Sequence, residues 1–262
     1  MLNHFELAWG TLIGRGHVRT GKNNQDACHA RADGKTLVAV VCDGCSGGRH
    51  SEVGAAIGAR LLVETLNRNL VSADASERSP ESLAGARFWE AVRREMLRDL
   101  RRIARRLGGN LPQLIHEYFL FTAVGAVVTP RHAALFSLGD GLLVLNGGLL
   151  RLGPFPGNQP PYLGYALDER MARRFPPDAL RFQVHQVFPT EALRSLLLGT
   201  DGVEDLVTLG ALRRFWEDDR CFTNPDMIRR QLALIGREPG LLSDDTTLIV
   251  IRRKPGEARH GA

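Results

Sequence analysis

The chain has 262 residues, of which 44% are hydrophobic and 24% are charged, and its formal net charge is +5. These values are close to those of globular proteins, and the length allows a sizeable core. A membrane-spanning protein is excluded, because every apolar run is broken well before the roughly 20 residues that a spanning helix needs. The N-terminus also lacks the pattern of a secretory signal. We expect one cytoplasmic domain over residues 1–253 and a frayed tail over 254–262.

The first predicted elements lie in the N-terminal half. A β-branched and apolar run predicts a strand over Thr36–Cys42. Apolar residues at helical spacing predict a helix over 54–70, and a loop over 71–82 separates it from an arginine-rich helix over 87–109. Further strands are predicted at apolar runs bounded by Gly, Asp or Pro, namely Phe119–Thr129, Ala133–Leu138, Leu142–Leu145, Leu149–Leu152, Arg181–Phe188, Ser195–Gly199 and Thr246–Arg253.

Short strands dominate the middle of the chain. Those between residues 133 and 152 follow one another directly, which predicts consecutive hairpins with Asn146-Gly147 as a tight turn. Residues 153–165 contain four prolines and three glycines and are expected to form a long ordered loop. A helix is expected over 225–236. The helices fall in separate blocks, which favours an α+β fold with antiparallel sheets.

Much of the basic charge lies in the predicted helix over 87–109. Such a stripe can bind nucleic acid or an acidic partner. However, Glu90, Glu95 and Asp99 can pair with its arginines along the helix, and the aromatic interleaving of a single-strand binder is absent. The pattern favours a solvated helix face, and we expect no nucleic-acid binding.

The four cysteines are few and irregularly spaced. Cys42 and Cys45 form a C-x-x-C pair, which can be redox-active or half of a zinc site. The second pair that a structural zinc site needs is missing. We therefore interpret the thiols as small, semi-buried residues in a reducing compartment.

Aspartate recurs at the ends of predicted strands, as Asp43-Gly44, Asp140-Gly141, Asp201-Gly202 and Asp244-Asp245. Asp-Gly is common in hairpin turns, and Asp33-Gly34 fits such a turn. Carboxylates that gather at strand ends raise one another's pKa unless cations neutralise them, and an all-oxygen cluster suits Mg²⁺ or Mn²⁺. Two such ions can activate water for attack on a phosphate ester. The spacing alone leaves two hypotheses open, a two-metal phosphoesterase and scattered turn aspartates.

Five motifs, taken in their order along the chain, resemble those of a known protein family. NNQDA, VVCDGCSGGRHSEVGA, FSLGDG, LGTDGVEDL and SDDTTLIVIR together resemble the metal-dependent protein phosphatase family of type 2C, from about Gly14 to Arg252. GRGHVRTGKNNQDA and GNQPPYLGY look like its bacterial branch. The resemblance implies a four-layer α-β-β-α sandwich of two antiparallel sheets flanked by helices, with a metal site at one end.

The resemblance also implies a set of site residues. Asp43 matches the carboxylate that bridges two Mn²⁺ or Mg²⁺ ions, and Gly44 matches the residue that offers its backbone carbonyl. Asp201 and Asp244 match the other core ligands, and Asp26 matches an acid that reaches a metal through water. Two further acids match residues linked to a third, weaker metal, and these are Asp140 and Asp205.

This sequence departs from the wider pattern at several positions. Gln25 replaces a carboxylate near the first metal, and Cys45 stands where some members carry a histidine proposed as general acid. Asp245 lies where the family often has Asn, so we rank it below Asp244 as a ligand. For the phosphate-binding arginine, Arg19 is the better candidate, and the alternative residue for this role is His17.

The implied function is a serine/threonine protein phosphatase in which metal-activated water attacks phosphorus and no phosphoenzyme forms. Its implied partners are a phosphorylated protein and a cognate serine/threonine kinase. Two alternatives remain, a non-catalytic relative that binds phosphoproteins and a metal-dependent nuclease. The presence of Asp43, Asp201 and Asp244 argues against the first alternative. The segment over 150–181 is expected to lie near the site and to select substrates.

Overall fold

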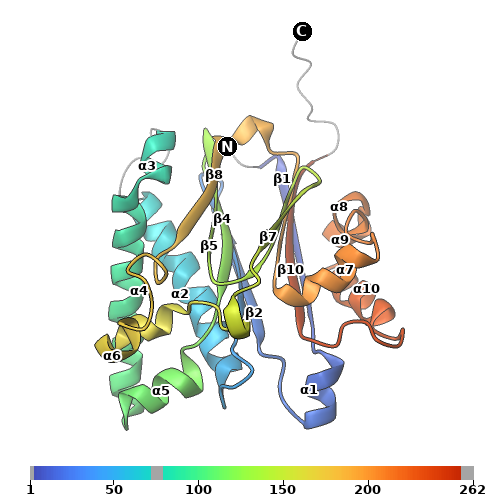
Figure 1. The fold of residues 1–262 in the computed structure, drawn as a ribbon. Helices are drawn as coiled ribbons and strands as arrows, with labels where there is room; N and C mark the ends of the chain where they lie inside the picture. Colours follow the sequence, from blue (N-terminus) through green and yellow to red (C-terminus); the bar gives the residue numbers. More distant parts are fainter. Residues whose placement is uncertain (1–2, 72–78, 255–262) are drawn as a thin grey trace.

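The computed structural model describes residues 3–71 and 79–254. Two five-stranded sheets pack face to face, and all neighbouring strands in them are antiparallel. Figure 1 shows helices on the outer face of each sheet, so the fold is a four-layer α-β-β-α sandwich. This confirms the predicted fold class. None of the helices in the described ranges is both long and apolar enough to cross a membrane.

The two sheets have the strand orders β1-β10-β9-β6-β7 and β2-β3-β4-β5-β8. The first sheet consists of β1 (Phe5–Leu12), β10 (Thr246–Arg253), β9 (Ser195–Gly199), β6 (Gly141–Leu145) and β7 (Gly148–Leu152). The second sheet consists of β2 (Asp26–Ala32), β3 (Leu37–Asp43), β4 (Ala123–Val128), β5 (His132–Leu138) and β8 (Gln183–Pro189).

Helices of different lengths cover the two sheets. The second sheet is covered by α2 (Ser51–Val71), α3 (Pro80–Ala84), α4 (Ala86–Leu107), α5 (Leu111–Tyr118) and α6 (Glu169–Ala172). The first sheet is covered by α7 (Glu204–Thr208), α8 (Arg214–Glu217), α9 (Arg220–Thr223) and α10 (Met227–Ile235). The short helix α1 (Arg15–Thr20) lies at the lower end of the sandwich in Figure 1.

Strand β3 shows why the central strands are apolar throughout. Side chains of a strand alternate between its two faces. Val38, Val40 and Cys42 therefore enter the core between the second sheet and its helices, whereas Ala39 and Val41 enter the core between the sheets. A strand that is buried on both faces has no polar alternation, and its sequence is a continuous apolar run.

Most predicted elements from Ala133 onward agree with the structure to within two residues at each end. The Asn146-Gly147 turn is confirmed, with both residues at positive φ. The sequence prediction missed β1 and did not define β2, each of which lies at one edge of its sheet. Most residues of these two strands are only half-buried, and their sequences form no continuous apolar run.

The prediction of consecutive hairpins was wrong between β5 and β6. These strands belong to different sheets, and the chain crosses from one to the other at Gly139–Gly141. Gly139 and Gly141 have φ of 92° and 134°, which non-glycine residues rarely adopt. The Gly-Asp-Gly sequence, which is also typical of a hairpin turn, here connects strands of two different sheets.

Two other boundaries differ from the sequence prediction. Residues 119–122 precede β4 as an irregular segment, since Phe119 caps the C-terminal end of α5. The predicted loop over 71–82 ends in the short helix α3, which begins at Pro80, while residues 72–78 lie outside the described ranges. The predicted loop over 153–165 contains a 3₁₀ turn over Pro156–Asn158 and ends within a second one over Leu163–Leu167. The predicted tail lies outside the described residues from 255 onward.

The packing of α2 on α5 generates a stability prediction. A Cβ atom placed on Gly54 would lie 1.4 Å from the carbonyl oxygen of Tyr118. Gly54→Ala should therefore lower the free energy of unfolding by about 2–4 kcal/mol, although Ala is normally the better helix former by roughly 1 kcal/mol. Urea denaturation measures the difference. As a control, Ala56→Gly at an exposed position of α2 should cost no more than about 1 kcal/mol.

A stabilised Gly54→Ala protein would contradict this packing of α2 against the end of α5.

Candidate metal centre

Aspartates from both sheets meet at one end of the sandwich. Asp26 opens β2 and lies opposite Asp43, which closes β3. Asp201 follows β9 and Asp244 precedes β10 in the other sheet, and Asp140 lies at the crossover between the sheets. Each of the other four carboxyl groups contributes to the raised pKa of Asp43. The structure therefore brings these five predicted residues into one electrostatic cluster.

Without a cation, the carboxyl groups of the cluster are harder to ionise than exposed ones, since the pKa values of Asp26, Asp43 and Asp201 are raised. Burial, reinforced by the neighbouring carboxylates, raises the pKa of Asp43 well above its ordinary value. Burial is also the main cause that raises the pKa of Asp26 to about 8, with Asp245 and Asp201 adding to it. The pKa of Asp201 rises to about 6, through burial and then through Asp244 and Asp140. A cation among these groups would offset their repulsion.

Asp26 has a carboxylate oxygen that is available to bind a metal ion or a metal-bound water molecule. Its Oδ2 accepts a hydrogen bond of 2.7 Å from Thr200 Oγ1, which joins the two sheets. Its Oδ1 is buried and has no hydrogen-bond partner within residues 3–71 and 79–254. Buried polar atoms of this kind need an explanation, and a hard cation with oxygen ligands provides one.

No three His, Cys, Asp or Glu side chains in the described part of the chain are grouped closely enough to hold a metal ion. The cluster fits Mg²⁺ or Mn²⁺ if backbone oxygens and water complete the coordination, as is usual for Mg²⁺. Gly44 is placed for a backbone contribution directly after Asp43. A Cβ on Gly44 would lie 2.8 Å from the carbonyl oxygens of Gln25 and Ser51, so the position has no room for a side chain.

The irregular segment before β4 fixes the position of Asp43. The backbone N–H of Thr122 donates to the carbonyl of Asp43 at 2.8 Å, and the Asp43 N–H donates to Thr122 Oγ1 at 3.2 Å. Phe121 forms an isolated bridge with Gly44. These contacts explain why residues 119–122 leave the strand conformation that their apolar sequence predicts.

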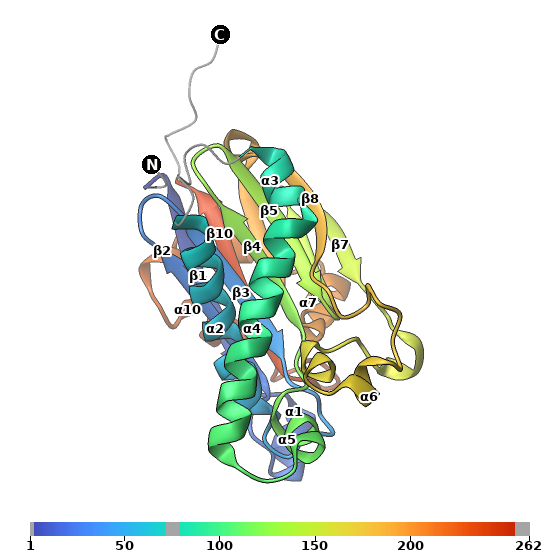
Figure 2. The same cartoon turned by 90° about the vertical axis from the view of Figure 1, so that its left-hand side faces the viewer.

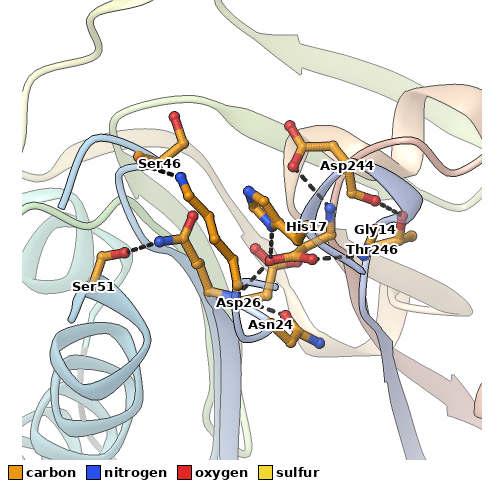
Figure 3. Close-up of polar contacts among 12 residues, drawn as sticks. Gly14, His17, Asn24, Asp26, Ser46, Ser51, Asp244 and Thr246 are labelled. Carbon is orange, nitrogen blue, oxygen red and sulfur yellow. Dashed lines mark hydrogen bonds and ion pairs between the residues drawn. The ribbon is translucent and has the colours of Figure 1, made fainter. Parts of the chain in front are cut away.

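Asp245 organises the surroundings of Asp244. Its carboxylate is only 2% exposed and accepts hydrogen bonds from the Gly14 N–H at 2.7 Å, from the Gln25 N–H and from His17 Nδ1 at 2.8 Å. Its own N–H donates to Asp244 Oδ1 at 2.8 Å. Figure 3 shows Gly14 and His17 close to Asp244. Asp245 therefore ties the start of β10 to α1 and to the segment before β2.

His17, and not Arg19, reaches the carboxylates within the described residues. The imidazole of His17 is 13% exposed and is held by Asp245. Arg19 lies exposed two residues further along α1. Arg19 belongs to the short helix α1, which lies before Asp26 in the chain. The linear motif does not reveal this helix.

The two acids predicted near a third metal have different surroundings. Asp140 is partly buried beside Gly153, whose Cβ would lie 3.2 Å from that of Asp140, and burial raises its pKa. Asp205 instead accepts a hydrogen bond of 2.7 Å from the Leu242 N–H. Leu242 has a φ of 47°, so Asp205 stabilises a strained turn just before Asp244. Its link to a third metal stays a prediction.

The two departures from the family pattern have defined contacts. The amide nitrogen of Gln25 donates to Ser51 Oγ at 2.6 Å, while its Oε1 is buried with no partner in the described ranges. Cys45 lies beside Tyr162, and burial, followed by Cys45, raises the pKa of the Tyr162 hydroxyl. Asp43 also contributes to that rise, so Tyr162 of the segment over 153–165 lies near the site. Substrate selection by residues 150–181 stays a prediction.

The hydrogen bonds of Asp245 predict an unusual cost for a conservative change. Oδ1 faces the Gly14 N–H and Oδ2 faces the Gln25 N–H, so either orientation of an amide would direct its NH₂ at a backbone donor. Asp245→Asn should lower the free energy of unfolding by about 2–4 kcal/mol, measured by urea denaturation. The matched control is Asp178→Asn at an exposed site, with an expected change within about 0.5 kcal/mol.

Equal stability of the two variants would show that Asp245 does not depend on its three donors.

Comparison with known proteins agrees with this geometry. A protein-family model described as protein phosphatase 2C matches residues 13–233. No curated protein matches the chain at a significant level.

Solved structures with a similar fold include bacterial phosphatases. A bacterial serine phosphatase has a TM-score of 0.56 at 18% identity, over 96% of this chain and 98% of that chain. The serine/threonine phosphatase of S. agalactiae has a TM-score of 0.57 at 17% identity, over 95% of this chain and 100% of that chain. That of Mycobacterium tuberculosis has a TM-score of 0.51 at 16% identity, over 95% and 99% of the two chains.

At these identities the solved structures establish the fold, and the family model adds the match in sequence over most of the chain. With the strand-end aspartates in the positions described above, the chain belongs to the protein phosphatase 2C family.

Proposed function

We propose that this protein is a metal-dependent serine/threonine protein phosphatase that hydrolyses phosphate monoesters in phosphoproteins. The observation that carries the proposal is the convergence of Asp26, Asp43, Asp201 and Asp244 from two sheets, together with the partnerless Oδ1 of Asp26 in the described ranges. The family match and the phosphatases of similar fold support it. The substrate would be a phosphoprotein in the cytoplasm, phosphorylated by a cognate serine/threonine kinase.

The proposed ligand set consists of Asp43, Asp201, Asp244 and the carbonyl of Gly44, with Asp26 acting through water. Two Mn²⁺ or Mg²⁺ ions bound there would activate a water molecule and offset charge on the phosphoryl oxygens. Asp140 is partly buried near this set and is proposed to support a third, weaker ion together with Asp205.

Other residues of the chain position this set. Thr200 holds Asp26 across the two sheets, and Asp245 holds both Asp244 and His17. Since Nδ1 of His17 faces Asp245, Nε2 is the ring atom left for the substrate. We propose that His17 contacts the phosphate through Nε2, in place of Arg19.

A second candidate function is phosphoprotein binding without catalysis. It is favoured by Gln25 in place of an acid and by the absence, within the described ranges, of three side chains grouped tightly enough for a metal. The two candidate functions are distinguished by catalysis, because only a phosphatase would hydrolyse a phosphorylated substrate.

The decisive test is hydrolysis of p-nitrophenyl phosphate and of a phosphothreonine peptide in the presence of Mn²⁺, Mg²⁺ or EDTA. We expect turnover with a metal ion and none with EDTA. Asp43→Asn should reduce kcat by at least about 1,000-fold, because it removes the proposed bridging charge. Asp33→Asn, in the β2–β3 turn, is the control and should retain activity.

No turnover from a folded wild-type protein with any metal ion would reject the phosphatase and favour the binding protein.

The role of His17 is tested with His17→Asn. An Asn amide can still donate to Asp245, but it has no atom at the position of Nε2. We expect a stability close to wild type, unchanged Mn²⁺ binding by calorimetry and a kcat/KM lower by roughly 10- to 100-fold. Arg19→Ala, the control on the same helix, should change kcat/KM by less than about threefold. The opposite ranking would return the phosphate contact to Arg19.

A further inference from the structure

Five exposed arginines line one side of α4. Their positions recur at intervals of seven, four, three and four residues, which keeps them within a narrow strip of a helix with 3.6 residues per turn. At a rise of about 1.5 Å per residue the strip is roughly 27 Å long. This arginine stripe consists of Arg87, Arg94, Arg98, Arg101 and Arg105.

The acidic residues of α4 leave most of this stripe unpaired. Glu95 and Asp99 lie on the flank toward α2, where both approach Arg68, at 3.4 and 3.9 Å. Asp99 also pairs with Arg98 at 3.3 Å. Glu90 pairs with Arg93, outside the stripe. Three members of the stripe have no carboxylate within ion-pair distance in the described part of the chain, namely Arg87, Arg94 and Arg105.

Helix α4, which carries the stripe, accounts for the net charge of the molecule. Helix α4 contains eight arginines and three acids, a surplus of five positive charges. This equals the formal net charge of +5 for the whole chain, so the remaining residues balance one another. The predicted ion pairs along α4 do form, but they lie on the two flanks of the stripe, through Glu95 and Asp99 on the side of α2 and through Glu90 on the other side.

Two hydrogen bonds connect α4 to the segment that follows the loop over 153–165. Arg101 donates to the carbonyl of Ala166 at 3.2 Å, and Arg93 donates to that of Leu180 at 2.7 Å. The segment between them includes α6 and adds Arg170, Arg173 and Arg174, and Figure 2 shows this segment to one side of the lower half of α4. Just before this segment lies Tyr162, whose pKa is raised chiefly by burial and then by the neighbouring Cys45 and by Asp43 of the metal centre. The arginine stripe therefore leads toward the site.

The chemistry of the stripe fits an acidic peptide better than a nucleic acid. Arginine forks bind carboxylates in a bidentate manner, and several along one helix suit a run of Asp and Glu. Single-stranded nucleic acids also need aromatic side chains for base stacking. The two aromatic residues of α4, Phe88 and Trp89, are buried in the core and unavailable for stacking.

We propose that an acidic segment of the phosphoprotein substrate docks along the arginine stripe while its phosphorylated residue occupies the metal centre. This proposal rests on the proposed phosphatase function and adds a substrate class to it, namely phosphoproteins with a run of Asp or Glu away from the phosphorylated residue.

The test compares two triple charge reversals. The stripe variant is Arg87→Glu, Arg94→Glu and Arg105→Glu. The control variant carries Arg214→Glu, Arg230→Glu and Arg237→Glu, which are exposed arginines on the other helical layer. Both variants change the net charge equally. Neither alters the metal centre or the residues that position it.

Two measurements are made on each protein. The first is kcat/KM for p-nitrophenyl phosphate and for two phosphothreonine peptides, one with an acidic run of about eight residues joined by a Gly-Ser spacer, the other with Gln and Ser in place of the acids. Spacers of about 6 to 12 residues cover a reach of roughly 20 to 40 Å. The second is fluorescence anisotropy of the acidic peptide without phosphate, which reports docking independently of turnover.

We expect the wild type and the control variant to prefer the acidic phosphopeptide by at least about tenfold in kcat/KM, and the stripe variant to lose this preference. Turnover of p-nitrophenyl phosphate should be the same in all three. The preference should fall as salt rises from about 0.05 to about 0.5 M, because exposed charges are screened.

The proposal is overturned if the stripe variant keeps its preference, or if the control variant loses it equally. Tighter, stripe-dependent binding of a DNA oligonucleotide than of the acidic peptide would reassign the surface to nucleic acid. If the wild type hydrolyses no substrate but binds the acidic peptide through the stripe, the phosphatase function fails, and with it the docking of a substrate. Turnover without any preference rejects the docking surface alone.

Discussion

The arrangement of the candidate site depends on the buried carboxylate of Asp245. It accepts hydrogen bonds from three donors that lie more than 200 residues away in the sequence. A buried charge is tolerated only when it is compensated, and these donors belong to α1, to the residue before it and to the residue before Asp26. The same residue fixes Asp244 through its own N–H. One carboxylate therefore sets the relative positions of His17, Asp244 and the start of β2.

The sandwich supplies the second constraint. Asp26 and Asp43 lie opposite each other on neighbouring strands of one sheet, whereas Asp201 and Asp244 come from the other. The Thr200–Asp26 hydrogen bond joins the two sheets at this end. Burial and mutual repulsion raise the pKa values of Asp26, Asp43 and Asp201, so the apolar layers that stabilise the fold also concentrate unfavourable charge. A fold that holds these carboxyl groups together favours cation binding, because a bound cation offsets their mutual repulsion.

Most strands and the strand-end acids could be predicted because their signals are local, whereas the four-layer sandwich was expected from the resemblance carried by the order of five motifs. Asp43-Gly44 follows an apolar run, and Asp201 and Asp244 flank similar runs. The contacts of Gly14 and Thr200 could not be predicted, because their partners lie 231 and 174 residues away and no local pattern encodes them. The edge strand β1 and the sheet crossover at Asp140-Gly141 were missed for related reasons. Strand β1 has mostly half-buried residues and no continuous apolar run, and Gly-Asp-Gly serves a hairpin and a crossover equally well.

The pairing of the first strand with the last has a consequence for synthesis of the chain. Strand β1 has β10 as its neighbour, and the Gly14 N–H donates to Asp245. Until residues 244–253 have left the ribosome, β1 lacks this partner and the carboxylates of the two sheets cannot assemble. Contacts between such distant residues form late in folding. A nascent chain would therefore have no complete centre until residues 244–253 have emerged and β10 has paired with β1.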